Sequence, residues 1–291
     1  MRCDLHVHTI HSGMCTIPGL RGICRESYNH PLAVYEKLKR LGMDLVTITD
    51  HDSIDAVEVL RSHPDFFLSE EVTCTLPGGT QLHLGVYDIT ERDHIELQRR
   101  RDDFQSLLAW LVDHDLFFSA NHIFSGLTGR RALEDFTLFE NVFPAIETRN
   151  GHMLEVANSH AAALADLAAR VEIGGSDAHA MASVGSAWTA VPGARNAREF
   201  LCGLRTGKGR VRGGNGNCYK LTRDVLAIGC EMIRENPATA PIALLGWMVP
   251  LIILANYTGE YVFARSWMAR YLQARFKEQA CSTSSHIAIM S

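Results

Sequence analysis

The chain has 291 residues, of which 46% are hydrophobic and 21% charged, with 28 Lys and Arg against 33 Asp and Glu and a formal net charge of −5. This composition excludes disordered and fibrous classes, and the length predicts one large α/β domain or two smaller ones. The mild acidity argues against an extended nucleic-acid-binding surface, because such a surface needs a basic face.

From the start of the chain to about residue 207, short β-rich apolar runs alternate with helical patterns. The predicted strands are Cys3–Val7, Asp44–Thr49, Phe66–Cys74, Gln81–Ile89, Phe117–Asn121, Ala145–Thr148, Val171–Gly175 and Trp188–Val191. The predicted helices are Pro31–Leu41, Ser53–Ser62, Glu91–His114, Ala132–Phe139, His152–Ala169 and Asn196–Thr206. Roughly seven βα steps of this kind favour a single barrel or a wound parallel sheet.

The character of the sequence changes after residue 207. A Gly-rich basic connector over 207–217 leads to a predicted helix at Leu221–Glu235, and residues 236–259 then carry no charge. An uncharged run of this length can span or contact a bilayer, here through 238–257, whereas Pro241, Pro250 and Asn256 favour a buried hairpin. We expect two units, 1–215 and 216–291, and a chain ending near Asn217 that folds by itself.

The cysteines and the start of the chain bear on its location. Eight cysteines are scattered without a CxxC pair, and the opening Met-Arg-Cys-Asp shows no signal-peptide pattern. Both features predict a reducing cytoplasm, with membrane association through the apolar extension as an open alternative.

The chain has fourteen histidines, most of them beside acidic residues between positions 4 and 179. Ligands gather at the carboxyl ends of strands in α/β folds, so the residues that follow or end each predicted strand matter most. These are His6 and His8, Asp50 and His51, Glu71, His83, His122, and Asp177 with His179. Imidazoles combined with carboxylates suit Zn²⁺, Mn²⁺ or Fe²⁺.

These residues, in this order, resemble the PHP family, named for polymerase and histidinol phosphatase domains. The resemblance rests on Asp4-Leu-His6-Val-His8-Thr, Thr49-Asp50-His51-Asp52, Glu71, His83, Asn121-His122 and Gly174-Gly-Ser-Asp177-Ala-His179, and it covers about residues 1–215. It implies a distorted (β/α)7 barrel, here with a helical, apolar C-terminal extension. It also implies two or three divalent metal ions and, usually, phosphoesterase activity.

The resemblance implies a role for each ligand. It places His6, His8, Glu71 and Asp177 around one metal, makes Glu71 a bridge to a second metal held by His83 and His122, and assigns His51 and His179 to a third. The sequence departs from the family pattern at Gly13, where the third-metal aspartate usually stands. His11 or Cys15 could substitute for that aspartate, but neither spacing matches, which favours a loop without ligands.

The expected reaction is hydrolysis of a phosphoester by a metal-bridged hydroxide. The catalytic residues are predicted to be Glu71, His179 and His51, with Asp50 orienting an imidazole. Phosphate needs fixed positive charge, for which Arg130, Arg131 and Arg149 are the predicted sources. The predicted substrate is a small phosphomonoester, a nucleotide or an oligonucleotide end.

Two other functions are compatible with the same residues. An amidohydrolase-like enzyme would use clustered His and Asp side chains to activate water against a C–N bond. A degenerate PHP module could serve as a membrane-tethered scaffold. The retention of eight predicted ligands argues against the scaffold.

Overall fold

The computed structural model describes the backbone of residues 1–289 and the side chains of residues 1–277. Its larger sheet has the order β2-β3-β4-β5-β6, in which the first three strands are antiparallel neighbours and the last three are parallel. These strands are β2 (Ser69–Thr75), β3 (Gln81–Tyr87), β4 (Phe117–Ala120), β5 (Ala145–Asn150) and β6 (Val171–Gly175). A smaller antiparallel sheet joins β1 (Arg2–Cys3), β7 (Ala187–Ala190) and β8 (Arg210–Gly213).

The fold is therefore mixed α/β, as predicted, but the (β/α)7 barrel is not confirmed, since no closed ladder of strands runs around residues 1–289. Two predicted strands, over 3–7 and 44–49, are mostly irregular and join their neighbours through single bridges, such as Val7 to Ala178. Side chains replace ladder bonds there. The hydroxyl of Thr49, for example, accepts from the Val7 amide at 2.9 Å. Polar side chains in these segments compete with regular strand pairing.

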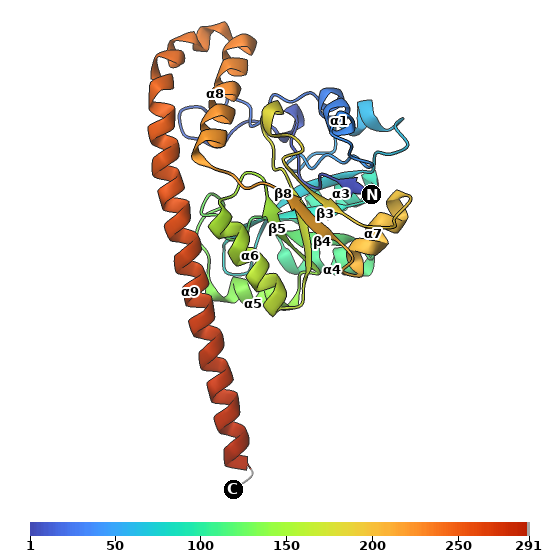
Figure 1. Ribbon diagram of the computed structural model, residues 1–291, viewed down its shortest axis with the longest axis vertical. Coiled ribbons are helices and arrows are strands. Elements are labelled where there is room, and N and C mark those ends of the chain that lie inside the picture. Colours follow the sequence, from blue (N-terminus) through green and yellow to red (C-terminus); the bar gives the residue numbers. More distant parts are fainter. Residues whose placement is uncertain (290–291) are drawn as a thin grey trace.

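Helices lie around the two sheets of the α/β body (Figure 1). They are α1 (Pro31–Arg40), α2 (Val57–Leu60), α3 (Glu91–Arg100), α4 (Phe104–Asp113), α5 (Leu133–Asn141), α6 (Glu155–Leu167) and α7 (Ala197–Arg205), with short 3-10 turns η1 (Ile10–Ser12) and η2 (Met181–Ser183). The main core lies between β2–β6 and α3–α6, where Leu84, Leu107 and Phe139 are fully buried. Burying such side chains supplies most of the stability of a domain this size.

The helix predicted over 91–114 is two helices. α3 ends at Arg100, and Asp103 caps the start of α4 by accepting hydrogen bonds from the amides of Gln105 and Ser106 at 3.1 and 3.2 Å. A short polar side chain at this position satisfies amides that a continuous helix would bond internally. The single-helix prediction was wrong because it followed the apolar spacing and passed over this cap.

The predicted connector over 207–217 also contains regular structure. Its residues 210–213 form β8, which pairs with β7 in the register Trp188 to Arg212. The residues of β8 are half-exposed or exposed. The smaller sheet therefore extends into the predicted connector and ends before the predicted boundary at residue 215.

The C-terminal extension is a helical hairpin. α8 (Cys218–Glu235) leads through the 3-10 helix η3 (Pro237–Met248) to the long helix α9 (Val249–Ile289), which contacts α5, α6 and α8. In Figure 1, α9 runs along one side of the α/β body, and the turn of the hairpin projects beyond it. One helix, Pro237–Lys277, is long and apolar enough to cross a membrane by length and composition, with a mean hydropathy of 2.0 and only 11% of its most apolar stretch buried. This is weak evidence for membrane association.

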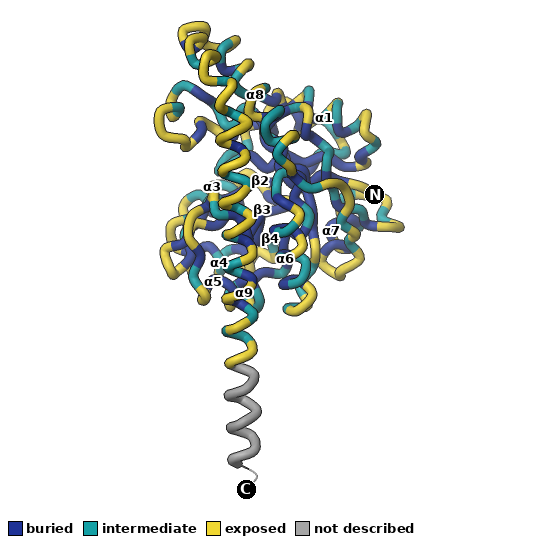
Figure 2. The backbone as a smooth tube through the Cα atoms, turned by 60° about the vertical axis from the view of Figure 1, so that its left-hand side comes forward, coloured by how far each residue is buried: buried dark blue, intermediate teal, exposed yellow. Residues whose placement is uncertain are grey.

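α9 is not independent of the α/β body. Its Ala264, Met268 and Tyr271 belong to the main core, and Trp267 stacks on Phe136 with ring centroids 5.8 Å apart. Figure 2 shows that exposed and intermediate residues alternate along α9, with single buried residues on the side that meets the body. The division into units 1–215 and 216–291 stays a prediction, but a chain ending near Asn217 would uncover this part of the core.

We predict that Met268→Ala lowers the free energy of unfolding by about 2–4 kcal/mol, because it leaves a cavity in the core. Urea unfolding followed by circular dichroism measures this. The matched control is Leu251→Ala on the same helix, whose side chain is 58% exposed and whose truncation should cost under about 0.5 kcal/mol. Equal effects of the two substitutions would show that α9 does not pack on the body in solution.

Candidate metal centre

Glu71 lies at the centre of a buried cluster of histidines and carboxylates. Its carboxylate oxygens lie within 3.6 Å of nitrogens from five imidazoles, those of His6, His8, His51, His83 and His122. Glu71 comes from the middle of β2 and is fully buried. Asn121 donates to the same carboxylate at 2.8 Å. The structure thus gathers residues from four other segments of the chain around one side chain.

His6 and His8 present their Nε2 atoms to each other at 3.0 Å. The Nε2 of His8 also lies 3.2 Å from the Asp177 carboxylate. His179 stacks on His8, with ring centroids 4.2 Å apart. All eight predicted metal ligands are therefore in one continuous cluster.

Hydrogen bonds to the far side of two rings set their tautomers. The Nδ1 of His6 lies 2.8 Å from the Glu147 carboxylate, and the Nδ1 of His8 lies 3.0 Å from the Ser12 hydroxyl. Because each Nδ1 then carries the proton, each Nε2 keeps its lone pair facing the cluster. This is the form in which histidine binds a metal.

The sequence analysis expected Asp50 to orient an imidazole. In the structure Asp50 contacts no ring directly and instead bonds to the Ser12 hydroxyl, which contacts His8. Its carboxylate accepts from the Ser12 hydroxyl at 2.6 Å and from the amide and hydroxyl of Thr9, both at 2.5 Å. No imidazole of the described residues contacts it within hydrogen-bond distance. Asp50 thus positions His8 through Ser12, because a hydroxyl that donates to Asp50 can accept from His8.

Two of the ligands have backbones in the left-handed region, where residues with a Cβ are strained. Asp177 has φ 51° and His122 has φ 32°. Asp177 is held there by its amide, which donates to the His6 carbonyl at 2.6 Å, and His122 by its amide, which donates to Glu147 at 3.1 Å. Strain of this kind persists where the surroundings over-determine it, which is frequent at functional sites.

Gly175, just before Asp177, permits a close approach. A Cβ there would lie 2.3 Å from the backbone nitrogen of His6. Only glycine lets the end of β6 pass so near the segment that carries His6 and His8.

The electrostatic environment keeps the ligands in their binding forms. Burial lowers the pKa of His51 to about 3 and that of His83 to about 4, so both rings are neutral at pH 7. Burial acts to raise the pKa of Glu71, but the surrounding histidines outweigh it and hold that pKa well below the usual range. Metal binding requires neutral imidazoles and ionised carboxylates.

His6 and His122 differ from His51 and His83, because nearby carboxylates raise the pKa of both rings against the effect of burial. Burial acts to lower the pKa of His6, but the carboxylates of Glu71, Asp177 and Glu147 together raise that pKa well above the usual value. The cluster therefore attracts positive charge at the position of His6.

The cluster fits divalent metal ions. The Nδ1 atoms of His51 and His83 and the Oε2 atom of Glu71 are buried without a hydrogen-bond partner among the described residues. Such orphaned atoms are costly unless another group satisfies them. Sets of donor atoms lying within 4.8 Å of one another include His6, His8 and Asp177; His6, Glu71 and His122; His51, Glu71 and His83; and His8, His51 and His179.

The structure adds residues that the sequence analysis did not select. Glu147 on β5 orients His6, and Asn150 donates to both Glu147 and Asp177, at 2.9 and 3.0 Å. His152 joins Asp177 and His179 in a further set of donors. A charged residue in the middle of the buried run Ala145–Asn150 was the signal that could have identified Glu147.

The three arginines predicted to bind phosphate have different surroundings. Arg131 is buried, and its guanidinium donates to the carbonyls of Ile123 and Gln81 and to the hydroxyl of Thr128. Its donors are thus committed to the fold, which contradicts a role in binding substrate. Arg130 is exposed, whereas Arg149 is half-buried and donates to Asn215 at 2.6 Å.

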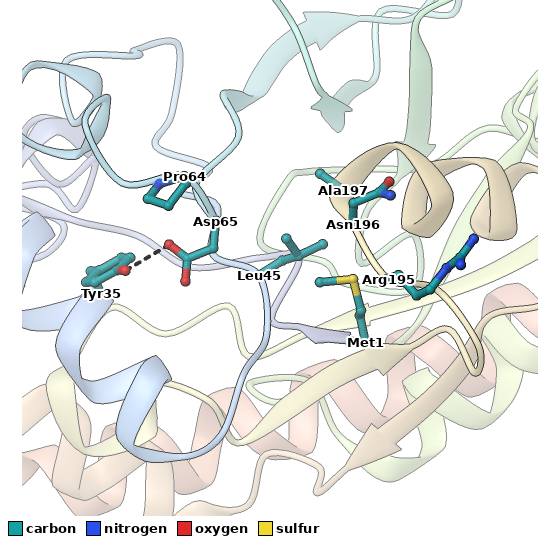
Figure 3. A pocket seen from close by; sticks show the side chains of 8 residues that line it. All are labelled: Met1, Tyr35, Leu45, Pro64, Asp65, Arg195, Asn196 and Ala197. Carbon is teal, nitrogen blue, oxygen red and sulfur yellow. Dashed lines mark hydrogen bonds between the residues drawn. The ribbon is translucent and has the colours of Figure 1, made fainter.

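A pocket of about 340 Å³ lies elsewhere, beside the first residue of the chain (Figure 3). Met1, Leu45 and Arg195 line it, and Tyr35 donates to Asp65 at 2.8 Å along its wall. None of the eight predicted ligands lines it.

Comparison with known proteins supports the predicted resemblance. Residues 155–208, which include Asp177 and His179, match a family described as PHP-associated. This match confirms the resemblance to PHP proteins over that part of the chain. No curated protein matches the chain.

Solved structures resemble the chain at low identity. PsfC from Pseudomonas syringae PB-5123 is 17% identical, with a TM-score of 0.53 over 79% of this chain and 97% of PsfC, which shows a shared fold. The lesion-specific endonuclease PfuEndoQ from Pyrococcus furiosus is 15% identical, covering 72% of this chain and 58% of the endonuclease, with a TM-score of 0.49. An amidohydrolase from Chromobacterium violaceum is 14% identical, covering 72% and 97%, with a TM-score of 0.47.

We predict that Glu147→Gln weakens divalent metal binding by roughly 10–100-fold, because the amide no longer fixes the ring of His6 as a charged acceptor does. Calorimetric titration of metal-stripped protein with Zn²⁺ or Mn²⁺ measures the affinity. Glu172→Gln, at an exposed position on the neighbouring strand β6, is the matched control. An unchanged affinity in Glu147→Gln would exclude Glu147 as a positioning residue.

Proposed function

We propose that this chain is a metal-dependent phosphoesterase that hydrolyses a small phosphomonoester, a nucleotide or an oligonucleotide end. The observation that carries the proposal is the buried Glu71 carboxylate among five imidazoles. Such a donor set suits Mn²⁺, Zn²⁺ or Fe²⁺. We propose two ions held by His6, His8, Glu71, Asp177, His83 and His122, with a third site considered below.

Bound divalent ions would neutralise charge on the phosphoryl oxygens and lower the pKa of water towards neutrality. The chain's own residues supply the rest. Glu147 and the Ser12–Asp50 pair hold the rings of His6 and His8 in the ligand tautomer. In the form with two ions bound and no third ion, His179, half-buried at the edge of the cluster, is the proposed proton donor to the leaving oxygen.

Two cations flank the loop that follows β5 and are the proposed phosphate contacts. Arg149 is the last residue but one of that strand, and Lys220 at the start of α8 donates to the Gly151 carbonyl and to the Ser186 hydroxyl. Burial lowers the pKa of Lys220, and its bond to Gly151 places the ammonium group beside the segment between Asn150 and His152. Lys220 lies in the extension and was not selected from the sequence.

We predict that the metal-reconstituted protein hydrolyses members of a panel of phosphate esters. Glu71→Gln should lower kcat/KM by roughly 100-fold or more, because Glu71 is the proposed ligand of both ions. Steady-state kinetics with nitrophenyl phosphate, nucleoside monophosphates and short oligonucleotides measures this. Glu70→Gln is the matched control, since Glu70 is equally buried but faces His94 and Gln98, each at 2.9 Å.

A parallel panel of amides separates the alternatives. Turnover of amides but not of phosphate esters would favour the amidohydrolase-like enzyme. Metal binding without turnover of either panel would favour a scaffold.

We also propose that the protein is cytoplasmic and that the segment 238–257 contacts a membrane surface. Leu244, Trp247 and Leu251 expose 78%, 69% and 58% of their surface at the turn of the hairpin. α8 runs beside this segment and carries several charged residues, so insertion across a bilayer would carry those charges into lipid. Shallow contact by the turn avoids this cost.

We predict that the full chain floats with phosphatidylcholine–phosphatidylglycerol vesicles in a density gradient and that Trp247→Ser weakens this binding. Loss of an interfacial tryptophan removes apolar area and a ring that favours the headgroup zone. Trp110→Ser on α4, far from the hairpin in sequence, is the control. Full recovery of the wild-type protein in the vesicle-free fraction would contradict the membrane proposal.

A further inference from the structure

Glu26 is an acidic residue of the loop between η1 and α1, and it lies on the side of the His51 ring that faces away from Glu71. Its Oε1 lies 3.9 Å from the Nε2 of His51, while the Nδ1 of the same ring lies 3.1 Å from Glu71. One imidazole therefore stands between two carboxylates. This separation from Glu26 is too long for a hydrogen bond, so the two atoms are neighbours without a direct bond.

The loop that carries Glu26 is fixed at several points. The amide of Glu26 donates to the Gly13 carbonyl at 3.0 Å, and the hydroxyl of Ser27 donates to the His8 carbonyl at 3.3 Å. From outside, Arg25 pairs with Glu235 of α8 at 2.7 Å. The carboxylate is thus held next to the metal ligands by the same segment that packs on the extension.

The charge of Glu26 is not balanced by the protein. No Lys or Arg of residues 1–277 forms an ion pair with it, and its side chain is 27% exposed. A largely buried carboxylate in this position lacks a cation.

The neighbouring donors define where that cation would sit. His51 and His179 belong, with His8, to a set whose donor atoms lie within 4.8 Å of one another. The Nε2 of His51 points towards Glu26. Two ligand atoms on one Zn²⁺ ion with bonds near 2 Å lie roughly 3–3.5 Å apart, so Glu26 and His51 need to approach by less than about 1 Å to share an ion.

We propose that Glu26 is the carboxylate ligand of a third divalent ion, which it binds together with His51 and His179. Gly13, which stands at the position of the usual aspartate, has no side chain and lies exposed. Glu26, thirteen residues later in the same loop region, would supply the carboxylate in its place. One carboxylate and two neutral imidazoles form a ligand set suited to Zn²⁺ or Mn²⁺. The proposal rests on the metal-dependent function proposed above and extends it to a residue outside the predicted ligands.

The test is the number of ions bound by the full chain. Metal-stripped protein is reconstituted with Mn²⁺ or Zn²⁺, and elemental analysis and calorimetric titration give the stoichiometry of the wild type, of Glu26→Gln and of Glu36→Gln. Glu36 is the matched control because it lies on α1, close in sequence, with 57% of its side chain exposed. We expect three ions in the wild type and in Glu36→Gln, and two in Glu26→Gln.

Thermal unfolding of each metal-loaded protein shows whether Glu26→Gln folds, and retention of its two remaining ions shows that the rest of the centre is intact. Three ions in Glu26→Gln, or only two in the wild type, would overturn the proposal. If the counts are as expected and no phosphate ester is hydrolysed, the assignment of Glu26 stands and the proposed function fails.

Discussion

The burial of the Glu71 carboxylate is the constraint on which the rest of the structure depends. An ionised carboxylate inside a protein is costly unless charge or hydrogen bonds compensate it. Here the compensation comes from five imidazoles and Asn121, which arrive from separate segments of the chain. The two sheets and the irregular segments between them are arranged so that these side chains converge.

A second layer of contacts makes this convergence chemically specific. A histidine can bind a metal through either nitrogen, and its choice depends on what the other nitrogen meets. Glu147 and Ser12 decide this for His6 and His8. The strained backbones at His122 and Asp177 are held by hydrogen bonds to the same network, so orientation and strain have a common origin.

The extension has two physical parts. Its later turns pack on the main core through Ala264, Met268 and Tyr271, and Glu260 accepts from the Ser125 hydroxyl at 3.0 Å, close to His122 in sequence. Its earlier turns expose large apolar side chains around the hairpin. Contacts from α8 to the loop of Glu26 and from α9 to the turn after His122 connect this apolar surface to both sides of the proposed metal centre.

The sequence by itself predicted most of the strands and helices and the eight side chains that the structure brings together in one cluster. It could do so because strand side chains alternate and because the ligands stand at recognisable positions after apolar runs. The resemblance to the PHP family followed from their order. The break between α3 and α4 also has a local sequence signal, the capping residue Asp103.

Only the tertiary structure showed what Glu147, Arg131 and Glu26 contact. The contact from His6 to Glu147 joins residues 141 positions apart, and the donors of Arg131 end on carbonyls of other segments. No local pattern encodes such partners, because charge and hydrogen-bond complementarity arise when distant segments meet. Whether the strands close into a barrel could not be predicted from the sequence for the same reason. The amides of Val7 and Thr9 donate to the side chains of Thr49 and Asp50, where the strand-like sequence predicted backbone pairing.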